Sequence, residues 1–334
     1  MSNLANQRFL EITMGGHLCF AACAVAELGV ADSIPRGSSR PVAELAAEAS
    51  CDPGFLYRTL RLLASYEIFQ ETAPRTFALT PVAESMRSDA KDSIRAGLRM
   101  VHRILKSQQG LEEGLRTGET PFTKAFGQPL FGYLSSHPDD AAIFDAGMGS
   151  FHGPEAAAML AAYDLSGIGT LADIGGGSGS LMIAILTKYP NLKGLLFDLG
   201  HVIGRSRGNI QAAGLADRCR IAEGDFFAAI PSGADAYLMR HIIHDWNDEQ
   251  SVTILRNCRR VIPASGRLLI AETVVPPANE RSFAKDFDFL MMLYPGGMER
   301  TVDEYRALFQ AAGFELRGIT PTTSLVSVIE GRPV

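Results

Sequence analysis

The sequence predicts a two-part protein, with a mainly helical N-terminal domain followed by a doubly wound α/β domain. From Thr170 onward, strand-like apolar runs alternate with helical patterns, which is typical of a parallel sheet with helices on both faces. The pattern of the first hundred residues instead predicts several helices and one short hairpin. Two late strands, at 314–319 and 325–329, are too close for a crossover helix, so one should run antiparallel.

The N-terminal pattern begins with a helix over residues 1–30 and continues with helices over 42–49 and 54–66. Asp52 can cap the last of these, with Pro53 in its first turn. A hairpin over 68–80 completes a winged-helix pattern. DNA binding is one interpretation, but the net charge of −6 and the lack of a basic run favour a packing or dimerisation module and no nucleic-acid partner.

The composition is that of an ordinary globular protein, with 46% hydrophobic and 20% charged residues among 334. The five cysteines are scattered, which indicates reduced thiols. The apolar run 18–31 contains Glu27 and looks too short to span a bilayer, and no basic leader precedes it. We therefore expect a cytoplasmic protein without a membrane partner.

The expected domains are residues 1–95, a helical linker over 96–165 and the α/β domain over 166–334. The linker is rich in large apolar side chains, and helices between two domains commonly wall a ligand cleft. Phe144, Met148 and His152 are its candidates for contact with an aromatic ligand, although core packing is the alternative for such residues.

A glycine-rich turn follows the first strand of the α/β domain, at Leu171–Ser180. Gly175 and Gly177 lack a Cβ, so a ligand can lie directly against the backbone. The dinucleotide fingerprint of NAD-dependent oxidoreductases is the nearest alternative, but the third glycine, Gly179, comes one position early. The second strand ends at Asp198, about where doubly wound folds hold a ribose.

Residues suited to ligand binding lie at or just after the carboxyl ends of the first five strands, where such folds bind ligands. The set consists of Gly175, Asp198, Gly224 with Asp225 and Phe226, Arg240 to His244, and Glu272. Taken in order, the segments 171–179, 197–199, 224–227, 240–248 and 296–301 resemble the two-domain S-adenosylmethionine (SAM)-dependent O-methyltransferases, the family of plant caffeic acid and flavonoid enzymes and of bacterial enzymes acting on aromatic metabolites.

This resemblance implies a winged-helix dimerisation domain, a Rossmann-like catalytic domain and a homodimer that converts SAM to S-adenosylhomocysteine. Asp198 would hold the ribose hydroxyls, Asp225 the adenine amino group and Phe226 the adenine ring. The complete cofactor set implied is Asp173, Gly175, Gly177, Asp198, Gly224, Asp225, Phe226 and Arg240.

By the same resemblance, His244 is the general base for a hydroxyl of an aromatic or conjugated small molecule, and Glu272 and Glu299 flank it. A phenol titrates near 10 and an imidazole near 6.5, so full deprotonation of the phenol before reaction would cost roughly 5 kcal/mol. A positioned base avoids most of this cost by removing the proton as the oxygen attacks the methyl group. Candidates for the substrate site also include Asp245, Phe289 and Met292. N- or C-methylation and SAM binding without methyl transfer remain alternatives.

A metal site is the competing hypothesis for the histidines, because His241 and His244 lie three residues apart and near Asp245 and Asp248. The metal interpretation is disfavoured because Asp248 also makes a good helix cap, and because the resemblance implies no metal.

Overall fold

The computed structural model describes residues 2–152 and 155–334, apart from the side chains of residues 2–5, 151, 152 and 201. It divides into two compact units. The first contains Met1–Gln109 and Phe131–Gly153, and the second contains Gly110–Leu130 and Pro154–Val334. The linker segment predicted from the sequence thus contributes helices to both units.

The first unit is built around a winged helix. Its elements are α1 (Ser2–Leu28), β1 (Ser39–Pro41), α2 (Val42–Glu48), α3 (Pro53–Ser65), β2 (Phe69–Ala73) and β3 (Thr76–Leu79). Asp52 caps α3 as predicted, because its Oδ1 accepts hydrogen bonds of 2.8 Å from the N–H groups of Gly54 and Phe55. The sequence missed β1, which pairs with β3 to make a three-stranded antiparallel sheet.

Helix α1 extends well beyond the apolar run that the sequence suggested. Its segment Asn6–Leu28 is 23 residues long with a mean hydropathy of 1.5, which meets the length and composition of a membrane span, and 17% of the most apolar window is buried. The expectation of a stretch too short for a bilayer was based on residues 18–31 alone, whereas the apolar helical segment begins at Asn6. Large apolar side chains remain exposed along it, among them Phe9, Ile12 and Phe20.

The remaining helices of the first unit are α4 (Pro81–Glu84), α5 (Arg95–Ile104), most of α8 (Leu130–Ser136) and α9 (Pro138–His152). The second unit contains α6 (Leu111–Thr117), α7 (Pro121–Phe126), α10 (Glu155–Ala162), α11 (Ser180–Lys188), α12 (Gly200–Ala212), α13 (Asp248–Val261), α14 (Phe283–Leu293) and α15 (Val302–Ala312).

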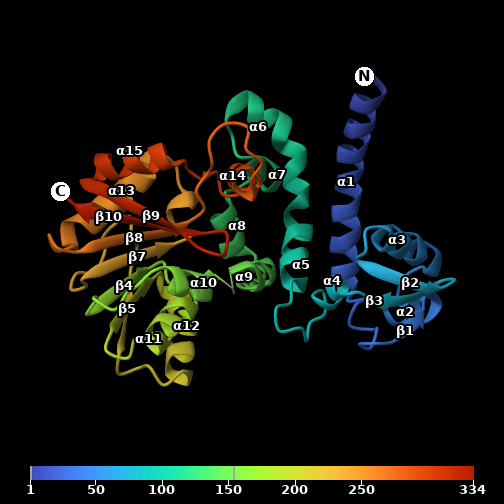
Figure 1. Cartoon of the computed structure of the whole chain (residues 1–334), viewed down its shortest axis with the longest axis horizontal. Coiled ribbons are helices and arrows are strands. Elements are labelled where there is room, and N and C mark those ends of the chain that lie inside the picture. The colour runs from blue at the N-terminus through green and yellow to red at the C-terminus, as the bar shows by residue number, and fades with distance from the viewer. Residues whose placement is uncertain (1, 153–154) are drawn as a thin grey trace. The chain divides into compact units, whose positions relative to one another are not determined.

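A seven-stranded sheet forms the centre of the second unit (Figure 1). Its strands are β4 (Thr170–Ile174), β5 (Lys193–Asp198), β6 (Cys219–Glu223), β7 (Ala236–Arg240), β8 (Arg267–Glu272), β9 (Phe314–Pro321) and β10 (Ser327–Pro333). The order is β6-β5-β4-β7-β8-β10-β9, and β10 runs antiparallel to both of its neighbours, which confirms the predicted reversal.

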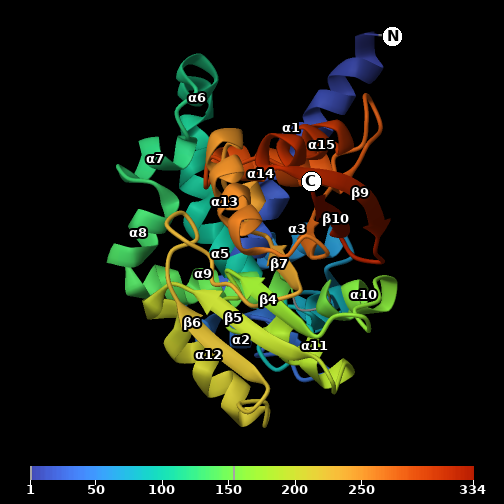
Figure 2. The same cartoon turned by 90° about the vertical axis from the view of Figure 1, so that its left-hand side faces the viewer.

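Helices cover both faces of this sheet, with α11 and α12 on one and α13 and α15 on the other (Figure 2). Alternate residues of β4 point to opposite faces of the sheet. Leu171 belongs to the same hydrophobic core as Met182 of α11, whereas Ala172 and Ile174 belong to the core that includes Leu255 of α13. The strand order reverses between β4 and β7, so a crevice for ligands is expected at their carboxyl ends.

Candidate active site

The glycine turn after β4 takes a backbone shape that only glycine adopts without strain. Gly175, Gly177 and Gly179 have φ values of 71°, 58° and 80°. A Cβ on Gly177 would have no neighbour within 4 Å, whereas one on Gly175 would lie 2.3 Å from the side chain of Ile242, just after β7. The turn is therefore open at Gly177 and tightly packed across the switch point at Gly175.

Two carboxylates support this turn. Asp198, at the end of β5, accepts a 2.8 Å hydrogen bond from the N–H of Gly177. Asp173 is buried, and its Oδ2 has no hydrogen-bond partner among the described residues. Burial, partly offset by the charge of Arg240 and reinforced by Asp198, raises the pKa of Asp173 to about 7. These groups suit a ligand that brings hydroxyl groups and a positive charge.

The loop after β6 contributes an aromatic wall. Gly224 packs so closely on Phe197 that a Cβ would meet its ring at 2.7 Å. Phe226 lies 3.9 Å from the Cβ position of Gly175, and its ring centroid is 6.1 Å from that of Trp246. Asp225 is exposed and accepts a 2.8 Å hydrogen bond from the N–H of Phe227. The predicted cofactor residues from three different strand ends thus lie along one edge.

His244 is buried in the turn after β7 and paired with a carboxylate. Its Nδ1 lies 2.6 Å from Oε1 of Glu299, and its Nε2 lies 3.6 Å from Oδ1 of Asp245. Burial opposes protonation of the ring, but the charges of Asp245, Glu299 and Glu272 outweigh it and raise the pKa of His244 to about 10. Since Glu299 occupies Nδ1, Nε2 is the nitrogen left to exchange a proton with a ligand.

Glu272 acts on the backbone of this turn, while Glu299 holds the ring. Oε1 of Glu272 accepts hydrogen bonds of 3.1, 2.7 and 3.2 Å from the N–H groups of Ile242, Ile243 and His244. Its Oε2 accepts one of 2.8 Å from the hydroxyl of Tyr305. The two glutamates predicted together at the site therefore have different contacts.

Arg300, which is fully buried, also holds this turn. It pairs with Asp248 at 2.8 Å and donates to the carbonyl oxygens of Ile243 and Trp246. The prediction that Asp248 caps α13 was wrong, because Asn247 is the N-cap residue and Asp248 occupies the first turn. Arg300 lies in segment 296–301, which carries part of the family resemblance, but nothing in that segment indicated its ion pair with Asp248.

A second glutamate–histidine pair lies beside the first. Nε2 of His241 is 2.8 Å from Oε2 of Glu155, and the His241 ring centroid is 5.0 Å from that of His244. Burial and the neighbouring charges of His244 and Arg240 hold the pKa of His241 well below its usual value. Within the described part of the chain, no group of three or more potential ligands is placed to hold a metal ion.

Helix α14 places aromatic side chains near the histidines. The ring of Phe287 lies 5.8 Å from the His244 ring, a contact that the sequence analysis missed. Phe289 and Met292, which it named, lie on the same helix and are 45% and 37% exposed. Residues 287 and 289 are about 200° apart around the helix axis, so only one of them can face the histidines. The sequence does not show which face of α14 points toward them.

The other predicted substrate residues lie on α9 of the first unit. Phe144 and Met148 are four residues apart on one helix face and are partly buried. The side chain of His152, at the end of α9, lies outside the described part of the structure. These three residues remain predictions.

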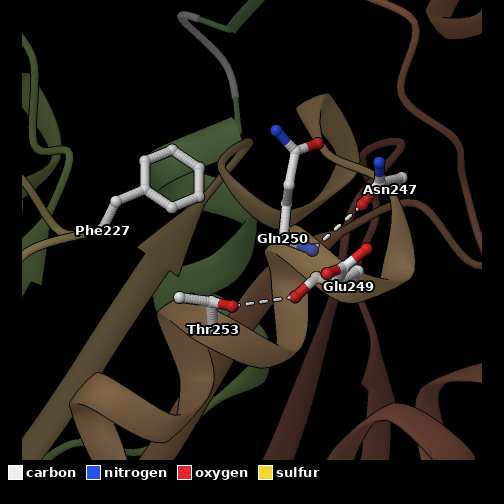
Figure 3. A pocket seen from close by; sticks show the side chains of 5 residues that line it. All are labelled: Phe227, Asn247, Glu249, Gln250 and Thr253. Atoms are coloured by element: carbon white, nitrogen blue, oxygen red, sulfur yellow. Dashed lines mark hydrogen bonds between the residues drawn. The ribbon is translucent and has the colours of Figure 1, made fainter.

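A hollow of about 430 Å³ lies between Phe227, whose ring centroid is 5.1 Å from that of Phe226, and the first turns of α13 (Figure 3). Its described lining residues are Phe227, Asn247, Glu249, Gln250 and Thr253. Asn247 and Thr253 are engaged in hydrogen bonds within α13 and its cap. We assign no ligand to this hollow.

Taken together, the switch-point turn, the strand-end carboxylates and the buried glutamate–histidine pair define an α/β enzyme that binds a nucleoside-type cofactor beside an acid–base group. Residues 108–315 match the O-methyltransferase domain family, and residues 10–89 match the O-methyltransferase dimerisation domain. The chain belongs to the SAM-dependent O-methyltransferases.

The chain is similar to characterised methyltransferases over nearly its whole length. The chain is 39% identical to a phenazine O-methyltransferase of Lysobacter antibioticus, over 97% of this chain and 95% of that one. It is 34% identical to a 3-amino-4-hydroxybenzoate 4-O-methyltransferase of Streptomyces cremeus, over 95% and 87%. The solved structure of a calicheamicin-biosynthesis methyltransferase in its S-adenosylhomocysteine-bound form matches with a TM-score of 0.88 and 35% identity, covering 100% and 99%.

Proposed function

We propose that this enzyme methylates a phenolic hydroxyl of an aromatic small molecule, with His244 as the general base. The buried contact of 2.6 Å between Nδ1 of His244 and Glu299 carries the proposal. It fixes the ring and leaves Nε2 to accept the hydroxyl proton. When bound, SAM supplies an electrophilic methyl group. Because its pKa is raised to about 10, only the neutral form of His244 can take the proton, so kcat should rise with pH toward that value; once neutral, the ring is as basic as a phenolate.

The residues that would hold the cofactor follow from their places at the strand ends. Gly175 and Gly177 let it approach the backbone, Asp198 binds the ribose, and Asp225 and Phe226 bind the adenine. The buried Asp173 and the nearby Arg240 would face its charged amino-acid end. The open position at Gly177 and the unpartnered Oδ2 of Asp173 support this arrangement.

An aromatic acceptor is supported by two observations. Phe287 lies next to both histidine rings, which provides an apolar surface where water is displaced and charges interact strongly. The relatives named above include enzymes for a phenazine and a hydroxybenzoate, both aromatic. We propose that Asp245, Phe289, Met292, Phe144, Met148 and His152 complete the substrate site.

The direct test is methyl transfer from labelled SAM to a panel of phenols, including hydroxylated phenazines and aminohydroxybenzoates. We expect label in a methyl ether, located by mass spectrometry and NMR. Label on nitrogen or carbon would contradict the O-methylation proposal. SAM binding without transfer to any member of the panel would contradict the phenolic acceptor.

Asp198→Asn tests the ribose assignment. The amide keeps the size of the side chain but loses its charge, so each hydrogen bond from a ribose hydroxyl weakens. We expect the Kd for SAM to rise about 10- to 100-fold, as for loss of hydrogen bonds to a charged group. Calorimetric titration measures it, and an unchanged Kd in a variant with wild-type Tm would remove Asp198 from this role.

Glu299→Gln tests the origin of the basicity of His244. The negative charge of Glu299 favours the imidazolium, so its removal lowers the pKa of His244. The acid limb of kcat against pH should therefore move to lower pH, and the plateau should fall because the ring is held less firmly. A limb that stays in place would show that Glu299 does not set the titration.

We further propose a homodimer that buries the exposed apolar face of α1. Phe9, Ile12 and Phe20 share one helix face and are 71%, 62% and 54% exposed. Changing Ile12 and Phe20 together to Glu should raise the dimer Kd at least ~100-fold, and light scattering after gel filtration should show monomers. Gln7→Glu, on the opposite face of α1, is the control and should stay dimeric.

A further inference from the structure

Two buried polar atoms next to the proposed base have no hydrogen-bond partner among the described residues. They are Oε2 of Glu299 and Oγ1 of Thr273, and both residues are 3% exposed. Glu299 already uses Oε1 to hold His244. A buried carboxylate oxygen or hydroxyl without a partner is costly, and such atoms in native proteins are nearly always satisfied by protein or by buried water.

Backbone pairing brings these two residues side by side. Val274 and Arg300 form a parallel bridge, and the N–H of Val275 donates a 2.9 Å hydrogen bond to the carbonyl of Arg300. In a parallel pair, residues at matching positions point to the same face and alternate along the strand. Thr273 and Glu299 each precede a bridge partner, so their side chains share one face.

The contacts of neighbouring side chains agree with this alternation. Glu272 and Arg300 both bind the backbone of the turn that contains His244, on the face opposite to Thr273 and Glu299. One face of the bridge therefore anchors the backbone of the base, and the other carries the carboxylate that orients its ring.

We propose that the Thr273 hydroxyl is a positioning group for the base, linked to Oε2 of Glu299 by one buried water that accepts from the hydroxyl and donates to the carboxylate. A hydroxyl is suited to this role because it supplies a donor without a competing charge. The bond from this water stabilises the ionised carboxylate and fixes its plane, and the carboxylate in turn orients the His244 ring. This inference rests on the proposed role of His244.

Several other groups act electrostatically on the Glu299–His244 pair. They are Asp245 in the turn, Glu272 on β8 and Asp288 on α14, together with His241 and Tyr305. Arg240 acts in turn on His241, Glu304 and Arg300 act on Asp288, and Arg300 also acts on Tyr305. Thr273 differs from them because it is uncharged, so its replacement changes hydrogen bonding at Glu299 without adding or removing a charge.

Thr273→Val removes the hydroxyl and keeps the shape of the side chain, and Thr273→Ser restores the hydroxyl. In Thr273→Val we expect kcat to fall about tenfold with the KM for SAM unchanged. The lower of the two apparent pKa values of the Glu299–His244 pair should rise by about one unit, since the ionised carboxylate loses a donor. Thr273→Ser should return both quantities toward the wild type.

The pKa is measured by NMR on protein with ¹³C-labelled glutamate side chains, with the Glu299 signal identified by its absence in Glu299→Gln. This readout does not need methyl transfer, so it tests Thr273 even if the proposed function fails. A wild-type titration in Thr273→Val overturns the inference, as does a folded Thr273→Ser variant that behaves like Thr273→Val. A crystal structure tests for the bridging water, and its absence, or a Thr273 hydroxyl bonded elsewhere, also overturns the inference.

Discussion

His244→Ala is expected to lower kcat for methyl transfer by about 10²- to 10⁴-fold while leaving the affinity for SAM within a few-fold of the wild type. The ring is the only group of this residue that can take the hydroxyl proton, and its Nδ1 is already held by Glu299. Without the ring, an acceptor must ionise in solution or lose its proton to water. Single-turnover rates with labelled SAM, together with a calorimetric Kd, separate the two effects.

The control for this experiment addresses folding. Removing the ring leaves the buried carboxylate of Glu299 without its partner, which is costly in itself. His244→Asn places an N–H at the position of Nδ1, toward Glu299, but supplies no base, so it should be as slow as the alanine variant and more stable. His137→Ala removes an exposed histidine and should be fully active. Near wild-type turnover in both His244 variants would contradict the proposed base.

Much of the fold follows from short stretches of sequence, because caps and turns depend on neighbouring residues. Asp52 before Pro53 predicted a helix start that the structure confirms. The start of α15 is equally local, since the side chains of Thr301 and Glu304 cap it reciprocally. The alternation of strands and helices likewise predicted the parallel sheet and its one antiparallel strand. Strand β1 is too short, at three residues, for a periodic pattern to reveal it.

Apart from Glu299, which the family resemblance supplied, the residues around His244 that could be named from the sequence lie at or just after strand ends. The pairing of Glu155 with His241 spans 86 residues, and that of Arg300 with Asp248 spans 52, so no local pattern contains both partners. The positive φ of His241, 55°, is equally invisible, since glycine usually occupies such positions. These missed features share one role, because all of them hold the turn that carries His244.

Gly297 is the tightest of these supports, and its replacement by alanine gives the second large expected effect. A Cβ on Gly297 would lie 1.9 Å from the carbonyl oxygen of His244 and within 2.7 Å of the backbone of Asp245. These are backbone atoms, which cannot rotate away as a flexible side chain can. The N–H of Met298 also donates a 2.8 Å hydrogen bond to the same carbonyl, so the two segments cannot separate freely.

We therefore expect Gly297→Ala to displace the base by a large part of an ångström, lowering kcat about 100-fold and the free energy of unfolding by about 1–3 kcal/mol. Gly318→Ala, in β9, is the matched control, because a Cβ there meets nothing within 4 Å, and it should change neither quantity appreciably. Kinetics and urea unfolding of both variants measure the effects. Since the proposed SAM contacts lie on the strand-end residues and not on Gly297, the Kd for SAM should change far less than kcat. An equal loss of cofactor affinity would instead indicate a general collapse of the site, and wild-type kinetics would show that the base can move without cost.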